Sequence, residues 1–80
     1  MSFGLWLKQK RKLASLSQAA VSETLGYSSA QFVSNWERDL SLPPKRTLEK
    51  LSTMLNITVE EIRQEIIKHK KKEIEAEWTI

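Results

Sequence analysis

Apolar residues recur three and four positions apart along almost the whole chain, the spacing of one face of an α-helix. Leu48, Leu51 and Leu55 show this spacing most plainly, and Val33 and Trp36 repeat it. The 80 residues include only 2 Gly and 2 Pro, so the chain lacks the turns that a β-fold needs. A chain of this length supports one hydrophobic core. We therefore predict a single all-α domain of five helices.

The composition excludes several kinds of chemistry. The chain has 0 Cys, which rules out disulfides, thiolate nucleophiles and zinc sites with cysteine ligands. A small domain without such cross-links is typical of the reducing cytoplasm. No stretch approaches the roughly 20 consecutive apolar residues of a membrane span. The N-terminal charges follow the apolar residues, the reverse of a secretory signal. We expect a cytoplasmic protein.

The positive charge is unevenly distributed. The chain has 13 basic and 10 acidic residues, a net charge of +3. Residues 1–46 hold seven basic against three acidic residues, a net charge of +4, and residues 47–80 hold six against seven, a net charge of −1. A basic excess in one half indicates an anionic partner there, and a solvated helix face is the alternative.

Boundary residues divide the first half of the chain into three helices. Leu7 and Arg11 share the inner face of the first helix, and we expect Leu13 beside that face. Ser17 is suited to cap the N-terminus of the second helix, and Gly26 to end it. A capping box formed by residues 28–31, of the form S-x-x-Q, predicts the start of the third helix.

Similar signals divide the second half. Pro43 and Pro44 precede the fourth helix. Asp39 follows the third helix and Asn56 the fourth, and both residue types tolerate a left-handed backbone. Thr58 caps the fifth helix. The fifth helix turns Val59, Ile62 and Ile66 inward and continues well past His69.

Residues 17–38 form the most informative segment, because they are two short helices joined by a tight turn that contains a glycine. Such a pair sets the second helix at a steep angle, so that it enters the major groove of DNA. The outer side of that helix carries only small or amide residues, namely Ala30, Gln31, Ser34 and Asn35. Amide side chains donate and accept together, as bidentate reading of adenine requires.

About a dozen positions in order resemble the phage repressor and Cro-like (XRE-type) helix-turn-helix family, over roughly residues 5–67. They are Leu16-Ser17-Gln18, Leu25-Gly26, Trp36-Glu37-Arg38, Pro43, Pro44, Leu48, Leu51 and Leu55-Asn56-Ile57-Thr58. The resemblance implies an all-α, five-helix repressor-like fold, here with an extended C-terminal helix. It also implies a DNA-binding regulator that acts as a dimer, with a recognition helix at about residues 29–38.

The family pattern implies a role for each matching position. Ala30, Gln31, Ser34 and Asn35 would face the bases. Gln18, Ser28, Ser29, Lys45 and Arg46 would contact the DNA backbone, the two cations next to a helix N-terminus where a phosphate docks. Arg11 and Glu37 would form a buried structural ion pair.

Two positions of the third helix keep alternative interpretations. Gln31 either contacts a base or only closes the capping box with Ser28. Phe32 either packs in the core against Trp36 or lies exposed, where it could touch a thymine methyl group. The segment from residue 26 to 33 is one residue longer than the common pattern, so which of residues 29–32 face the groove stays open.

No residue pattern indicates an enzyme, a metal site or a cofactor. His69 is the only histidine, and no Asp, Cys or second His lies near it in the sequence to complete a metal or nucleophile site. The glutamates of the C-terminal part are typical of solvated helix faces. No glycine-rich phosphate loop occurs, no small-molecule effector is evident, and we expect no membrane partner.

Residues 68–80 form a charged helical extension beyond the 1–67 helix-turn-helix domain. Lysines occupy its first part and glutamates its second. Ile67, Ile74 and Trp78 make a narrow apolar stripe, which indicates a helix–helix seam and a possible dimer interface. The charge blocks favour antiparallel pairing. A frayed soluble tail and contact with DNA are the alternatives.

Together these patterns predict sequence-specific binding of double-stranded DNA. We expect a transcriptional regulator, a repressor, that acts as a homodimer on a palindromic operator in the cytoplasm, associated with a prokaryotic or phage nucleoid. The alternative is a protein-interaction or antitoxin-like module on the same fold, which would carry aromatic or apolar anchors on the third helix. A weaker alternative is a membrane-surface helix over residues 66–78.

Overall fold

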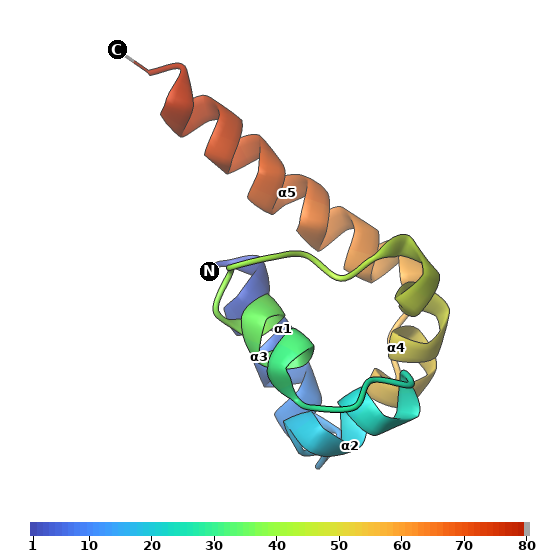
Figure 1. Cartoon of the computed structure of the whole chain (residues 1–80). Coiled ribbons are helices and arrows are strands. Elements are labelled where there is room, and N and C mark those ends of the chain that lie inside the picture. The colour runs from blue at the N-terminus through green and yellow to red at the C-terminus, as the bar shows by residue number, and fades with distance from the viewer. Residues whose placement is uncertain (80) are drawn as a thin grey trace.

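The computed structural model describes residues 1–79, and these fold into five α-helices and one short 3-10 helix, with no strand among them (Figure 1). The elements are α1 (Phe3–Leu13), α2 (Gln18–Thr24), α3 (Gln31–Glu37), η1 (Lys45–Thr47), α4 (Leu48–Leu55) and α5 (Val59–Glu77). The predicted all-α fold is therefore confirmed. No described helix is long and apolar enough to span a membrane.

All five α-helices contribute to one apolar core. The buried apolar residues are Phe3, Leu7, Val21, Val33, Trp36, Leu48, Leu51, Leu55 and Ile62. Helix α1 packs against α3, α4 and α5, and α4 packs against α1, α2 and α5, so these two helices connect the others. Burial of about nine such side chains at roughly 1.5–3 kcal/mol each is the main favourable term in folding.

Most of the predicted helix boundaries are confirmed. The Ser17 hydroxyl accepts the N–H of Ala20 at 3.0 Å, and the Thr58 hydroxyl accepts the N–H of Glu61 at 3.0 Å. Each hydroxyl satisfies an N–H group that has no partner inside its helix. The backbone turns left-handed at Gly26 (φ 87°) and Asn56 (φ 54°), and these residues end α2 and α4.

Three expectations about the first half are wrong. Helix α3 begins at Gln31 with Ala30 as its N-cap, and no side chain caps it, so the box from Ser28 does not form. The Ser29 hydroxyl instead accepts the N–H of Gln31 at 3.3 Å. Leu13 is 79% exposed, because α1 ends there without a neighbour over it.

The third wrong expectation is the core position of Phe32, the first of its two alternatives. Its side chain is 50% exposed, and its ring stacks on Tyr27 instead of packing against Trp36, with centroids 4.5 Å apart. The alternative of an exposed Phe32 is the one that the structure supports.

Helix α5 continues past His69 to Glu77, as predicted, and its C-terminal part projects beyond the other helices (Figure 1). It is continuous across the predicted boundary between residues 67 and 68. The extension was expected to reach Ile80, which lies outside the described residues.

Candidate nucleic-acid interface

Helix α3 presents an uncharged polar strip. Gln31 is exposed and Asn35, one turn later, is half-buried. The Gln31 side-chain nitrogen donates to the Asn35 side-chain oxygen at 2.8 Å. This bond leaves the Gln31 oxygen and the Asn35 nitrogen with no hydrogen-bond partner in residues 1–79, so the pair offers one acceptor and one donor side by side. Ala30 and Ser34 are half-buried.

Two aromatic rings lie next to this strip. Phe32 stacks on Tyr27, and Tyr27 in turn meets the buried Trp36 edge-on, with centroids 5.9 Å apart. The stack gives Phe32 a fixed position although half of its surface is exposed. Sequence reasoning missed Tyr27, because helical spacing does not relate a turn residue to a residue of the following helix.

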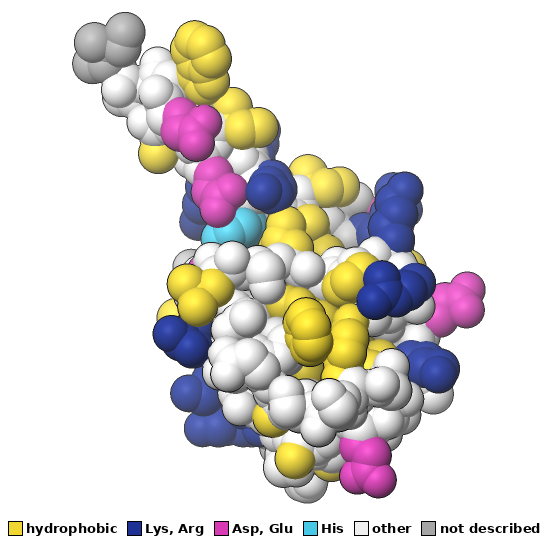
Figure 2. Space-filling model, in the orientation of Figure 1, with side chains coloured by type: hydrophobic (Ala, Val, Ile, Leu, Met, Phe, Trp, Pro, Cys, Tyr) yellow, Lys and Arg dark blue, Asp and Glu magenta, His cyan; other side chains and the backbone are white. Residues whose placement is uncertain are grey.

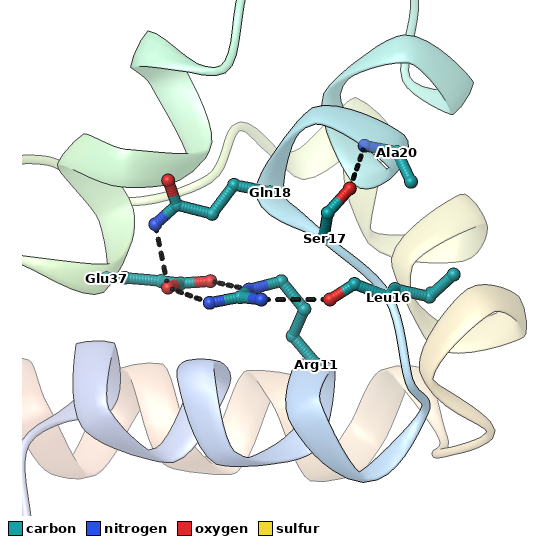
Figure 3. Close-up of polar contacts among 6 residues, drawn as sticks. All are labelled: Arg11, Leu16, Ser17, Gln18, Ala20 and Glu37. Atoms are coloured by element: carbon teal, nitrogen blue, oxygen red, sulfur yellow. Dashed lines mark hydrogen bonds and ion pairs between the residues drawn. The ribbon is translucent and has the colours of Figure 1, made fainter.

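Arg11 and Glu37 form a buried ion pair that joins α1 to the end of α3 (Figure 3). The guanidinium donates twice to the carboxylate, at 2.6 and 2.9 Å, and once to the carbonyl oxygen of Leu16 at 2.9 Å. The side chains are only 11% and 3% exposed. The hydrogen bond to Glu37 raises the pKa of Arg11, burial lowers it and the charge of Glu37 raises it further, with a net increase. Arg11 therefore stays charged, and its bonds to Glu37 tie α1 to the end of α3.

Gln18, expected to clamp a phosphate, also belongs to this network. It is half-buried at the first residue of α2, and its side-chain nitrogen donates to the Glu37 carboxylate at 3.0 Å (Figure 3). One of the two N–H donors of the amide is thus occupied inside the protein. Within the chain, this bond from Gln18 holds the start of α2 against the end of α3.

The other expected backbone contacts are exposed. Ser28 and Ser29 lie in the turn before α3, and Lys45 and Arg46 lie on η1, which leads into α4. Neither Lys45 nor Arg46 forms an ion pair with any residue from 1 to 79. In Figure 2 the face that shows α3 is largely uncharged, and Lys and Arg side chains lie at its margins. That arrangement would leave the α3 strip free to meet base edges while cations meet the flanking phosphates.

The fold also brings Asp39 to His69, which the sequence did not indicate, and Glu73 lies one turn after His69 on α5. Its Nδ1 lies 3.9 Å from Asp39, and its Nε2 lies 3.0 Å from Glu73. Asp39 is distant in sequence, takes a left-handed backbone (φ 60°) after α3, and accepts the N–H of Gly4 at 2.9 Å. No group of three metal-binding side chains occurs in the described part of the chain.

Comparisons with known proteins agree with this arrangement. The "Helix-turn-helix" family model matches residues 7–62. Among solved structures, the chain is similar to the P22 c2 repressor protein, determined in complex with synthetic operator 9T in the presence of Tl⁺. The two chains are 27% identical with a TM-score of 0.69, over 78% of this chain and 92% of that one. No curated protein sequence matches. The chain therefore belongs to the phage repressor and Cro-like helix-turn-helix family.

Proposed function

We propose that this chain is a DNA-binding transcription regulator that reads a specific sequence with α3, and that it acts as a dimeric repressor on a palindromic operator. The observation that carries the proposal is the Gln31–Asn35 pair, which turns one free acceptor and one free donor outward from α3. The major-groove edge of adenine offers the complementary donor and acceptor. The similar P22 c2 repressor was solved on an operator, which supports the same class of partner.

Base reading and backbone contact are assigned to different residues. Ala30, Gln31, Ser34 and Asn35 face the base edges, and Phe32 meets a thymine methyl group beside them. Ser28, Ser29, Lys45 and Arg46 contact phosphates, and Gln18 does so through the second N–H of its side-chain amide, because the first is bonded to Glu37. Contacts of the first kind give specificity and contacts of the second kind give affinity.

The alternative, a protein-interaction or antitoxin-like module, is less well supported by the surface of α3. Interfaces between proteins are anchored by buried aromatic and apolar side chains. On the outer side of α3 only Phe32 is of that kind, and its ring is already stacked on Tyr27. The family match likewise favours a non-enzymatic regulator.

Asn35→Ala is expected to relax specificity at one base pair by about 1–3 kcal/mol, because it removes one half of the amide pair. The measurement is affinity for the selected operator and for each single-base variant of it. Gln64→Ala is the matched control, since Gln64 also donates at 2.8 Å to a neighbour one turn away, Glu60, but lies on α5. Equal weakening on every sequence would exclude base reading by Asn35.

Lys45→Ala is expected to weaken binding to all sequences alike and to lower the slope of log affinity against log salt by about one unit, because one phosphate contact is lost. Titrations on operator and on random DNA at several salt concentrations measure both effects. Lys72→Ala serves as the control on the C-terminal extension. An equal change in slope from that control would mean that diffuse charge, and not a contact by Lys45, sets the salt dependence.

The proposal as a whole is tested by selecting bound sites from random duplex DNA at two salt concentrations. We expect enrichment of one sequence with two-fold symmetry at both concentrations, and loss of the unspecific background at the higher one. Binding without any enriched sequence would contradict the proposal of a sequence-specific regulator.

A further inference from the structure

The C-terminal part of α5 has an apolar face that nothing in residues 1–79 covers. Ile67, Ile74 and Trp78 are 49%, 56% and 80% exposed, and they lie on one side of the helix at intervals of seven and four residues. Ile62, which faces the core, is fully buried on another side of the same helix. The segment projects away from the body of the domain (Figures 1 and 2). Exposed apolar stripes of this kind mark interaction surfaces.

We propose that residues 67–78 pair antiparallel with the same residues of a second copy of this chain, and that Trp78 of each chain enters a groove of the other. The proposal of a two-fold dimer rests on the proposed function, because a palindromic operator is bound by two copies related by a two-fold axis. Two observations indicate that another copy of the chain covers the apolar face. They are the order of the charges along residues 67–78 and the position of the groove.

The order of charges selects the antiparallel direction. Lys70 and Lys71 flank the apolar stripe on its N-terminal side, and Glu75 and Glu77 flank it on its C-terminal side. In an antiparallel pair in which Ile67 lies opposite Trp78, Lys70 comes within about two residues of Glu77 of the other copy on one flank, and Lys71 within about one residue of Glu75 on the other flank, which is within reach of these side chains at 1.5 Å per residue. In a parallel pair, lysine would lie beside lysine and glutamate beside glutamate, which is unfavourable.

These charges are largely free to act between chains. Lys71, Glu75 and Glu77 form no ion pair within residues 1–79. Lys70 has only an exposed contact of 3.6 Å with Glu73, one turn away, and such pairs contribute little. Four symmetric ion pairs between the two helices would therefore replace almost no existing interaction.

The same register brings Trp78 to a groove at the base of the helix. The position opposite Trp78 is Ile67, and Ile67 lines a groove of ≈ 530 Å³ between α5 and the segment from Leu42 to Glu49. Six apolar residues line it, namely Leu42, Pro43, Leu48, Val59, Ile66 and Ile67, together with the charged residues Lys45, Glu49 and Arg63. A second hollow of ≈ 500 Å³ continues from it along Ile67 and Ile74. A tryptophan in an apolar pocket is the typical anchor of a protein interface.

Two helices of roughly a dozen residues bury an area at the low end of stable interfaces, so we expect self-association in the micromolar range. Sedimentation equilibrium of the full chain without DNA should give a mass approaching twice the 9.3 kDa of the monomer. Trp78→Ala should weaken the association at least about tenfold. Leu13→Ala is the control, because Leu13 is as exposed as Trp78, 79% against 80%, but lies on α1.

Engineered cysteines test the direction, and the absence of native Cys makes them unambiguous. Under oxidation, Ile74→Cys should form a disulfide-linked dimer, because residue 74 lies next to the two-fold axis. Ile67→Cys chains should cross-link with Trp78→Cys chains but not with each other, because the two copies of residue 67 lie about 16 Å apart along the axis at 1.5 Å per residue. Cross-linking of Ile67→Cys with itself would overturn the antiparallel arrangement.

A monomer at every concentration would overturn the pairing, and so would equal weakening by Leu13→Ala and Trp78→Ala. In either case selection on random DNA would still enrich one half-site sequence, because it tests base reading by α3, and only the two-fold symmetry of the selected sites would depend on the dimer. Conversely, a dimer that enriches no DNA sequence would support the pairing and contradict the proposed function, so the two failures are distinguishable.

Discussion

Arg11→Met is expected to lower the free energy of unfolding by about 3–5 kcal/mol, because it leaves the Glu37 carboxylate buried without its cation. Glu37 is 3% exposed in its side chain, and Arg11 supplies two of the three hydrogen bonds that it accepts; Gln18 supplies the third. An amide cannot neutralise the charge, so the remaining bond offsets only part of the loss. Urea denaturation of the variant and the parent chain measures the difference.

An exposed ion pair provides the control for this prediction. Arg63 and Glu60 lie 2.7 Å apart, almost the same distance, but are 57% and 58% exposed. Arg63→Met should therefore change the free energy of unfolding by at most about 0.5 kcal/mol. The double variant Arg11→Met/Glu37→Gln, which buries no lone charge, should lose only about 1–3 kcal/mol. Similar losses for Arg11→Met and Arg63→Met would mean that burial does not set the strength of these pairs.

The pKa of Arg11 predicts how this stabilisation depends on pH. A cation whose pKa is higher in the folded state stabilises the fold fully at pH values below its unfolded pKa, and the effect disappears as the pH rises through the folded value. Since the Glu37 contact raises a pKa that is already strongly alkaline, titration of Arg11 removes none of the stabilisation between neutral and moderately alkaline pH. The difference between parent and Arg11→Met should stay constant over that range.

The local signals in the sequence were sufficient to predict the helices. The caps at Ser17 and Thr58 and the left-handed residues Gly26 and Asn56 depend on backbone groups only a few positions away. Spacing in the sequence therefore specifies them. The helical spacing of the apolar residues alone predicted the inner faces of α4 and α5. Leu51 and Ile62, which lie on those faces, are almost completely buried.

Contacts between distant segments were not predictable in this way. Phe32 has the spacing of a core residue, but the ring of Tyr27 gives it a position at the surface. Ser28 has the spacing of a cap, but the turn before α3 places Ala30 at the cap position instead. His69 meets Asp39 only because α5 passes the end of α3. The turn at residues 27–30 decided the first two cases, and a contact between distant segments decided the third.

Gly4→Ala is expected to destabilise the fold by about 3 kcal/mol, although intrinsic helix propensity alone would favour the change by roughly 0.5–1 kcal/mol. Gly4 lies in α1, where the helix crosses the end of α3. A Cβ atom there would lie 2.8 Å from the carbonyl oxygen of Trp36 and closer still to the carbonyl group of Glu37. These are backbone atoms and cannot rotate away, so the two helices must separate.

Separation at this crossing would also loosen the contacts around it. The N–H of Gly4 donates to Asp39 at 2.9 Å, and the Arg11–Glu37 pair lies between the same two helices. Thermal unfolding of Gly4→Ala measures the loss, with Gly26→Ala as the control. Nothing lies within 4 Å of a Cβ on Gly26, where the cost comes only from the backbone at φ +87° and should be about 1 kcal/mol. If Gly4→Ala proved more stable than the parent, α1 and α3 could not be in direct contact at Gly4, and the support for the angle of α3 would have to come from the ion pair alone.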